Sequence, residues 1–485
     1  MYRFTVVLVL SAIVGLAFAF LPTGELPFKG IAPNDTTQDL LLPAGAQYDI
    51  LFSEQLDSVL TDDGRKLPAK GKQDFLAYLP INGSSEHGYI YVNHELRNAN
   101  DLLGDGGGMS WFEVQQENGH WKVVNNFHYI SFDNLGGTWH NCGGGITPKG
   151  SILTAEEYPT NSNAELSKDG THFKDTSDFN GFKRYEHMGW MVEVDPKTNK
   201  PLHKLYAMGR YSHEDVHCMP DGKTVYLTDD QSPGVFFKFV ADKKDDYTKG
   251  QLYAYQQTLD GKGGNWLALP RDTFSMINAR EVAFKLGATL FKGHEWVEVV
   301  NGKIYITETG GDTSNFAKAI RLGGKPAYHL SQAPNRINDT LYDAPYGHVL
   351  VLDPTTNLMQ ILITGGDLND GGNFSQPDAL TAVSIGNKQY LVVCEDIGST
   401  KRNRVGQTAA AKGEKYNEMY FLDLSKPNPS RNNLVRFSAG PRGCEQTGPI
   451  FTPDSKTMFM VVQNPDKRNA EPFNRSIVVA ITNCF

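Results

Sequence analysis

Short runs of large apolar residues that end in carboxylates or amides recur along the chain. Each run has the length and the β-branched or aromatic content of a strand, and turn-forming residues separate the runs. The runs cover residues 88–95, 150–157, 223–230, 303–308, 389–396 and 456–464. A strand-rich unit that repeats every ~75 residues is typical of propeller blades. The pattern therefore predicts an all-β fold, a six-bladed β-propeller with loop insertions.

A residue that can bind a metal ion stands a short distance before five of these runs. These residues are Cys142, Glu214, Glu295, Asp378 and Glu445. If each begins a strand that pairs with the following run as an antiparallel hairpin, the start of the first strand and the end of the second lie at the same edge of the sheet. Radial hairpins would then bring these side chains to one rim around a central opening, together with acidic residues from the strand ends. The strand-end candidates are Glu95, Glu156, Glu157, Glu308 and Glu395. Because like charges at contact distance repel strongly, such a rim requires cations.

The donor types indicate which cations the rim binds. Carboxylate and amide oxygens suit calcium, whereas carboxylates with a thiolate suit iron or zinc. Cys142 precedes three glycines that allow a close backbone approach, and a metal ion would stabilise its thiolate. The alternative is a buried cysteine before a glycine-rich turn, but the Glu156-Glu157 pair at the end of the next strand favours a ligand. For Glu295, the alternative is a solvent-facing carboxylate at a blade edge.

Length and composition indicate one domain. The chain has 485 residues, of which 40% are hydrophobic, and its composition does not shift along its length. We expect a single propeller domain over residues 20–485, in which residues 20–75 lack the repeat and either wrap the propeller or complete its last blade. Segments 160–185, 255–290 and 400–415 are polar and poor in strand signals, so they are predicted loop insertions.

The N-terminus has the organisation of a signal peptide. Arg3 supplies a positive charge, Val6 to Leu16 form an apolar segment that is short for a membrane span, and Ala17 to Ala19 fit a cleavage site. We therefore expect residues 1–19 to be removed from a secreted protein without a stable membrane anchor. Five sequons are compatible with glycosylation, at Asn34, Asn82, Asn338, Asn373 and Asn474.

Charge, cysteine count and missing motifs exclude several function classes. The formal net charge is −9, and no basic stripe indicates a nucleic-acid partner. The five cysteines leave at least one unpaired within the chain, and Cys142 is our candidate for it. No Walker-type phosphate loop, Gly-x-Ser-x-Gly elbow or Rossmann fingerprint occurs.

The stretch from Gly136 to Glu157 resembles the signature of the PhoX alkaline phosphatases. It contains Cys142-Gly-Gly-Gly and ends in the Glu156-Glu157 pair. The resemblance covers most of residues 85–465, because shorter motifs follow the family's order. These motifs are Asn93 to Glu95, Gly189 to Pro196, Gly209 to Glu214 and Gly443 to Asp454.

The resemblance implies a six-bladed propeller with ferric iron (Fe3+) and calcium (Ca2+) ions at one end of the channel. In the family, the cysteine and several glutamates ligate iron, and other acidic groups hold calcium. The motifs carry these ligand roles over to Cys142, Glu156, Glu157, Glu214 and Glu445. The family's Arg-Pro-Glu segment falls on Gly293-His294-Glu295, so the glutamate is kept and the arginine is not.

The missing arginine leaves the phosphate clamp unassigned, because arginine is the natural bidentate partner of a phosphate. Lys292, His294 and Arg442 lie close in sequence to ligand positions. We take them as the candidate catalytic residues that replace the arginine.

The rim and the resemblance together predict a secreted, metal-dependent phosphomonoesterase, a monomer that acts on small-molecule phosphate esters. Bound cations would hold the phosphate oxygens and activate a water or oxo nucleophile. One alternative is a calcium-dependent propeller lactonase or esterase, which needs no thiolate ligand. The other is a non-catalytic binding propeller whose calcium only stabilises the rim.

Overall fold

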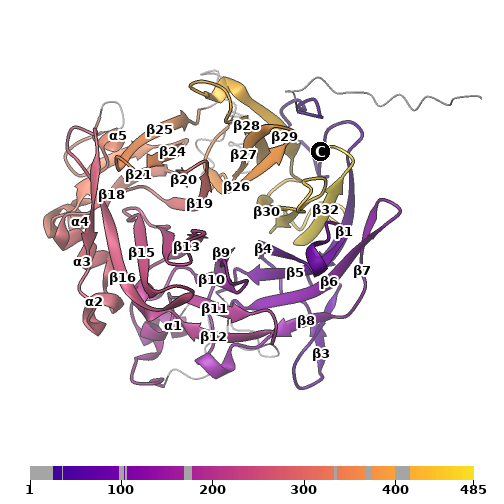
Figure 1. The fold of residues 1–485 in the computed structure, drawn as a ribbon, viewed down its shortest axis with the longest axis horizontal. Helices are drawn as coiled ribbons and strands as arrows, with labels where there is room; N and C mark the ends of the chain where they lie inside the picture. Colours follow the sequence, from indigo (N-terminus) through magenta and orange to yellow (C-terminus); the bar gives the residue numbers. More distant parts are fainter. Residues whose placement is uncertain are drawn as a thin grey trace, which may run out of the picture.

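The computed structural model describes residues 26–34, 36–97, 103, 106–168, 177–332, 336–366, 374–398 and 415–485. Antiparallel sheets stand side by side around a central axis, with one strand of each sheet nearest that axis (Figure 1). The expected signal peptide, the sequon Asn373 and nearly all of the insertion at 400–415 lie outside the described residues, so they stay predictions.

Six sheets form the ring, and each begins with its innermost strand. The first contains β4 (Gln73–Pro80), β5 (His87–His94), β6 (Met109–Glu117), β8 (Phe127–Ile130), β2 (Ser58–Leu60) and β3 (Lys66–Pro68), with β7 (His120–Val123) beside β6. The second contains β9 (Asn141–Ile146), β10 (Ile152–Glu156), β11 (Met191–Asp195) and β12 (Lys200–Lys204). The third contains β13 (His213–Cys218), β14 (Thr224–Asp229), β15 (Phe237–Lys243), β16 (Asp246–Gln257) and β17 (Gly264–Ala268).

The remaining three sheets complete the ring. The fourth contains β19 (His294–Val300), β20 (Lys303–Glu308), β24 (His348–Asp353) and β25 (Leu358–Thr364). The fifth contains β26 (Pro377–Ile385), β27 (Lys388–Glu395), β28 (Glu418–Asp423) and β29 (Leu434–Ala439). The sixth contains β30 (Glu445–Phe451), β31 (Met458–Gln463), β32 (Ile477–Thr482) and β1 (Gln47–Ser53). Each innermost strand contacts the innermost strands of both neighbouring sheets, so the ring is closed.

The predicted all-β propeller arrangement is confirmed, but five regular blades are found rather than the predicted six. Five sheets have the four or five strands of a regular blade, whereas the sheet that starts at β4 has seven strands. It is larger because β8 pairs with β6, and β2 then pairs with β8 in parallel. The non-repeating N-terminal segment supplies β2 and β3 of this enlarged sheet.

Small elements decorate the outside of the ring. The segment 255–290, predicted as a loop insertion, instead holds β17 and two helices, α2 (Thr273–Ile277) and α3 (Ala279–Leu286). With α4 (Ala317–Leu322) they line the outer edge at the left of Figure 1. The other short elements are α1 (Asn163–Lys168), α5 (Tyr328–Ser331), the pairs β18 (Thr289–Leu290) with β22 (Lys325–Pro326) and β21 (Gly311–Asn315) with β23 (Leu341–Ala344), and the 3-10 turns η1 (Ile81–Gly83), η2 (Asp133–Leu135), η3 (Arg184–His187), η4 (Tyr206–Met208) and η6 (Arg431–Asn433). No helix within the described residues is long and apolar enough to cross a bilayer.

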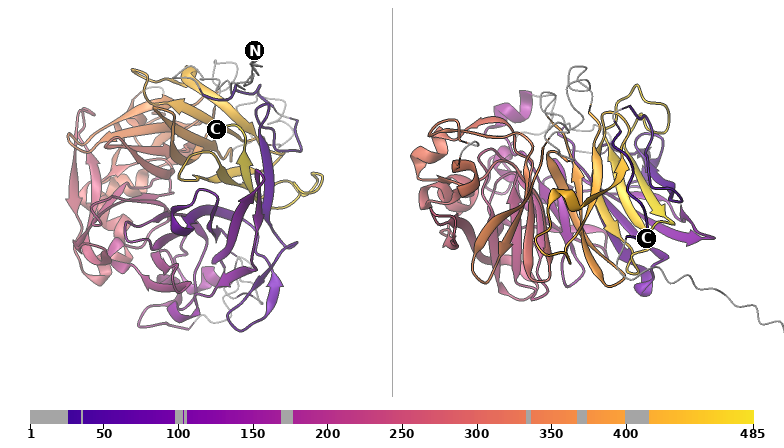
Figure 2. Two further views of the ribbon diagram at one scale, coloured as in Figure 1. Left: turned by 45° about the vertical axis from the view of Figure 1, so that its right-hand side comes forward. Right: turned by 90° about the horizontal axis from the view of Figure 1, so that it is seen from above.

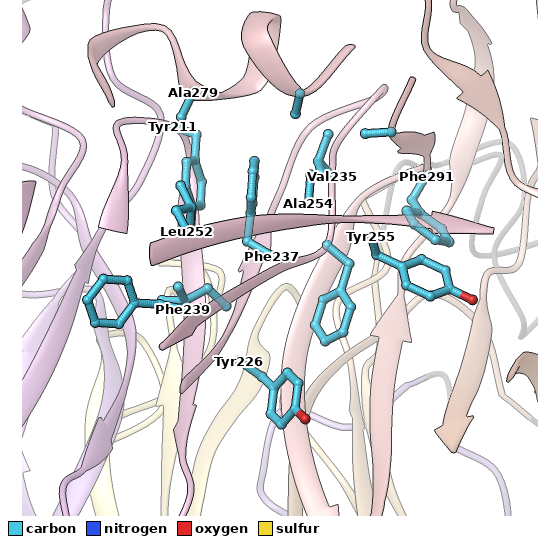
Figure 3. Close-up of a cluster of buried hydrophobic side chains, with 14 of the residues drawn as sticks. Tyr211, Tyr226, Val235, Phe237, Phe239, Leu252, Ala254, Tyr255, Ala279 and Phe291 are labelled. Atoms are coloured by element: carbon cyan, nitrogen blue, oxygen red, sulfur yellow. The ribbon is translucent and has the colours of Figure 1, made fainter. Parts of the chain in front are cut away.

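Aromatic and aliphatic side chains fill the space between neighbouring sheets. In the largest cluster, the ring of Phe237 on β15 stacks on Tyr211 with centroids 4.3 Å apart, and Ala279 of α3 covers the outer side (Figure 3). The second strands of the sheets, which are the recurring apolar runs, are buried on both faces. This explains why the runs lack the apolar–polar alternation of half-exposed strands.

The N-terminal strand closes the ring by completing the sixth sheet. β1 pairs with β32 in antiparallel register, and Figure 2 shows β1 in indigo beside the yellow C-terminal strands. Phe52 of β1 is fully buried and stacks on Phe112 of the first sheet with ring centroids 5.5 Å apart. The strand therefore joins the first and sixth sheets.

We expect Phe52→Ala to destabilise the protein by about 3–5 kcal/mol, because it leaves a cavity between two sheets. Tyr48 on the same strand is 36% exposed, so Tyr48→Ala is the matched control and should cost less than about 1 kcal/mol. Denaturant unfolding of both variants measures the difference. Equal losses would mean that β1 contributes no packing to closure.

Candidate metal centre

All six sheets contribute to one cavity of about 360 Å³ at the ends of the inner strands. Eight carboxylates and one thiol line it, with only a few other groups between them. The acidic residues are Glu95, Glu157, Glu214, Asp230, Glu295, Asp378, Asp396 and Glu445, and the thiol is that of Cys142. The fold thus gathers carboxylates from residues that are distant in the sequence.

Strand register decides which acidic residues face the cavity. In the third sheet, His213 pairs with Asp229, and the residues that follow them, Glu214 and Asp230, line the cavity. Successive side chains of a strand point to opposite faces, so one step along the chain moves a side chain between blade interior and cavity. The same register places Cys142 and Glu157, Glu295 and Thr309, and Asp378 and Asp396 on the cavity.

The structure brings seven of the predicted metal ligands together and places three elsewhere. Those on the cavity are Cys142, Glu157, Glu214, Glu295, Asp378, Glu445 and Glu95. The three outside its lining are Glu156, Glu308 and Glu395, each the last residue of a second strand. They are fully buried inside the blades. In each case it is the next residue in the sequence that lines the cavity.

Hydrogen bonds show what two of these buried carboxylates do. Glu156 accepts from Lys204 Nζ at 2.7 Å and from the backbone amide of Gly189 at 2.9 Å. Glu395 accepts from the backbone amides of Ser375 and Glu418, at 2.7 and 2.9 Å. They therefore hold their own blades together by satisfying buried donors, which leaves them no free oxygen to turn toward the rim.

Glu308 has a different environment, because histidines surround it. Its Oε1 accepts from the backbone amide of Lys292 at 2.8 Å, and its Oε2 lies 2.7 Å from His329 Nε2. His348 belongs to the same group, with ligand-type atoms of all three residues within 4.8 Å of one another.

The three predicted catalytic residues do not line the cavity. Lys292 Nζ donates to the carbonyl oxygen of Gly311 at 2.6 Å, and His294 is fully buried beside Phe291, with ring centroids 4.0 Å apart. Burial lowers the pKa of His294 to about 3, so its ring is neutral. Arg442 Nε lies 3.5 Å from Asp466 Oδ2, and neither residue lines the cavity.

Cys142 sits between two carboxylates. Its Sγ lies 2.9 Å from Asp74 Oδ2 and 3.0 Å from Glu214 Oε1. The glycine after it is required, because a Cβ on Gly143 would lie 2.3 Å from the backbone oxygen of Glu214 on the adjacent inner strand. The Cys-Gly-Gly-Gly motif therefore lets β9 pack closely against β13, and this contact brings Cys142 to Glu214.

A histidine bridges two rim carboxylates on the other side. His140 Nε2 lies 3.1 Å from Glu95 Oε1, and His140 Nδ1 lies 2.8 Å from Glu157 Oε2. The guanidinium of Arg97 stacks over the ring of Tyr158, 4.3 Å from its centroid, and Tyr158 lines the cavity.

Burial and mutual repulsion act on the acidic side chains of the rim. Burial first, and neighbouring carboxylates second, raise the pKa of Glu157, Glu214 and Asp378 well above its usual range. The pKa of Glu445 is raised in the same way. Burial acts to raise the pKa of Glu95 as well, but His140 and Lys72 outweigh it and lower that pKa to about 2.

Cations fit this donor set. Asp74, Cys142 and Glu214 form a compact group whose thiolate and carboxylates suit iron or zinc. Two further groups contain carboxylates alone, which suit calcium. They are Glu157 with Glu214 and Asp230, and Glu214 with Glu295 and Asp378. Because Glu157 and Glu214 recur among the groups, the rim offers one connected set of candidate metal ligands.

An all-β propeller with a thiol and many carboxylates at one end of its ring defines a metal-binding propeller protein. A family model described as alkaline phosphatase PhoX matches residues 26–466. The chain therefore belongs to the PhoX alkaline phosphatase family and is a metal-dependent phosphomonoesterase, which confirms the predicted family and activity.

Solved structures agree with this assignment at the level of the fold. Pseudomonas fluorescens PhoX in complex with vanadate, a transition state analogue, has a TM-score of 0.71 and 22% identity over 94% of this chain and 98% of that chain. A Trichoderma reesei enzyme of family AA12 has a TM-score of 0.42 and 11% identity over 93% of this chain and 100% of its own. Phage phi92 endosialidase also has a TM-score of 0.42, with 9% identity over 91% of this chain and 69% of its own. At TM-scores this low, the last two likenesses have no bearing on function. No curated protein sequence matches the chain.

Sequence reasoning missed several residues at the centre. Asp74 lies in an apolar strand without a motif, and only its position one residue into β4, like that of Glu214 in β13, marks it. Lys72, Arg97 and His140 lie in connecting segments. The charges of Glu95, Glu445 and Glu157 act on Lys72 and raise its pKa, with Glu95 first.

We expect two adjacent glutamates to differ in their roles. Glu157→Gln removes a rim carboxylate, so it should lower the metal content and leave the metal-free protein at least as stable. Glu156→Gln leaves the buried Lys204 ammonium without its carboxylate, so it should cost about 3 kcal/mol and leave the metal content unchanged. Elemental analysis and thermal melting of both variants separate the two effects. A loss of metal in Glu156→Gln would assign that residue to the centre.

We also expect the metal-free protein to lose stability as pH rises. The pKa of buried Asp74 is raised from 3.8 to about 7, so the folded state keeps a proton that the unfolded chain releases. This stabilisation is complete below the unfolded pKa and disappears as pH rises through the folded pKa. Thermal melts in chelator from about pH 5 to about pH 8 should show a falling Tm, and calcium should offset the fall. A Tm that rises with pH in chelator would contradict the raised pKa values of the rim.

Proposed function

We propose that the protein hydrolyses small phosphate monoesters at this cavity, with ferric iron and calcium as its resident cations. The observation that carries the proposal is the convergence of Cys142 and eight carboxylates from all six sheets on one cavity. A cavity of about 360 Å³ lies at the small end of the range for ligand sites. That volume supports a compact phosphate ester as substrate.

The donor chemistry supports two kinds of metal site in the cavity, one for iron and one for calcium. Asp74, Cys142 and Glu214 would hold iron, because the thiolate prefers the softer ion. The acidic residues around them would hold calcium, namely Glu157, Asp230, Glu295, Asp378, Asp396 and Glu445. Bound cations supply charge for the phosphate oxygens and lower the pKa of a coordinated water.

The chain's own residues support substrate binding beside the cations. Arg97 is exposed and lies over the ring of Tyr158, which lines the cavity. It takes the role proposed for the family arginine in place of Lys292, His294 and Arg442. Tyr158 donates to Asp230, and burial raises the pKa of its hydroxyl well above its usual range, so it remains a donor. Lys72 offsets the negative charge of Glu95.

The signal-like residues 1–19 and the sequons support an exported, glycosylated enzyme, and the ring described here supports a monomer. N-terminal sequencing of protein purified from the culture medium tests the expected cleavage after Ala19. Glycosidase treatment and size-exclusion chromatography test the other two points.

We expect Cys142→Ser to lose iron and phosphatase activity, because a serine hydroxyl does not replace a thiolate ligand. Iron and calcium content and hydrolysis of p-nitrophenyl phosphate are measured on one preparation. Cys484→Ser is the matched control, since both cysteines are 6% exposed and Cys484 lies outside the cavity lining. Retained iron and activity in Cys142→Ser would overturn the iron assignment.

We expect Arg97→Ala to raise KM for p-nitrophenyl phosphate roughly 30-fold, because a charge-assisted hydrogen bond is worth about 2 kcal/mol. The metal content should not change. Arg271→Ala is the control, because Arg271 forms its ion pair with Asp242 at the surface. An unchanged KM in Arg97→Ala would remove this residue from the substrate site.

A further inference from the structure

A row of histidines crosses the fourth sheet at the level where its second strand ends. His294 of β19 pairs with Glu308 of β20, and Glu308 pairs with His348 of β24. Directly opposed residues of antiparallel strands have neighbouring side chains on one face of the sheet. His329 of α5 joins the row from outside, with Nε2 2.7 Å from Glu308 Oε2.

The remaining hydrogen bonds leave one atom of each residue facing the others. The backbone amide of Lys292 occupies Glu308 Oε1 at 2.8 Å, which leaves Oε2 toward the histidines. His348 Nδ1 lies 3.3 Å from Thr364 Oγ1, while its Nε2 is buried without a hydrogen-bond partner. Such outer contacts are the kind that orient a histidine for metal binding.

His294 adds two more unpartnered nitrogens. Its side chain is fully buried, and neither Nδ1 nor Nε2 has a hydrogen-bond partner. Buried polar atoms are almost always paired, so three unpaired imidazole nitrogens in one row need an explanation. A bound cation accounts for His348 Nε2, because a neutral imidazole nitrogen is a metal ligand.

We propose a second metal site in the fourth sheet, separate from the rim cavity, that binds a divalent transition metal ion such as zinc. Glu308 Oε2, His329 Nε2 and His348 Nε2 are its ligands. Two imidazoles with one carboxylate form a zinc-type donor set, whereas the carboxylate groups of the rim suit calcium.

Two other sheets of the described ring use the corresponding position differently. The corresponding strand-end carboxylates of the second and fifth sheets, Glu156 and Glu395, are saturated by a lysine and by backbone amides. The His329 side chain is 11% exposed, so the site can be reached from solvent. An ion there would fasten α5 to the blade, because α5 contributes one ligand and the strands contribute the others.

Zinc binding by the full-length protein tests the proposal. After chelation and reloading with iron and calcium, which fill the rim, the protein is titrated with zinc, and bound metal is counted by elemental analysis. We expect one tight equivalent in the wild type, weakened at least roughly 100-fold in Glu308→Gln and in His348→Ala. His187→Ala is the control, a buried histidine on η3 that contacts the Leu135 carbonyl oxygen, and it should keep the equivalent.

A measurement on the wild type keeps the proposal falsifiable if these variants do not fold. Crystals of the wild-type protein grown with zinc should show an anomalous difference peak at the zinc edge between Glu308, His329 and His348. Cys142→Ser, which tests the rim, should keep this peak even if it loses activity. Wild-type crystals with zinc bound at the rim alone, or variants that bind zinc as the wild type does, would overturn the second site.

Discussion

Repulsion between buried carboxylates is the constraint on which this structure depends. Eight acidic side chains face one cavity, and burial with mutual repulsion raises the pKa of most of those that are shifted. Packing between the six sheets must hold these groups in place against their own charge, and the closed ring of inner strands supplies that resistance. Packing of the aromatic core thus offsets the repulsion between the carboxylates, and multivalent cations that bind there would reduce this repulsion and stabilise the fold.

The second organising element is the period of two along a strand. At each ladder end the paired residue faces into the blade, and the next residue faces the cavity. Glu156 and Glu157 show the result, since one binds Lys204 inside the blade and the other lines the cavity. Adjacent and chemically identical side chains therefore have a structural role and a proposed metal-binding role. In the fourth sheet, the inward position is used differently, because histidines and Glu308 occupy it together.

Much of the fold and the centre could be predicted from the sequence, because both repeat. The recurring runs are the second strands, and the predicted positions at the starts of the inner strands, such as Cys142, Glu214 and Asp378, do line the cavity. The sequence does not reveal where each ladder ends, so Glu308 and Glu395 could not be distinguished from the residues that follow them. Arg97 and His140 could not be predicted, because their positions depend on loops outside the repeat. The enlarged first sheet could not be predicted, because the short sequence of β8 does not identify β6 as its pairing partner.

Pairing of β1 with β32 also determines when, during synthesis of the chain, the ring can close. The sixth sheet combines a strand near residue 50 with one that ends at Thr482, and it carries Glu445. A nascent chain emerging from the ribosome therefore lacks a complete rim until almost its whole length has been synthesised. An ion that needs Glu445 as a ligand would then bind only after the sixth sheet has closed, and it would come from the compartment where that closure takes place.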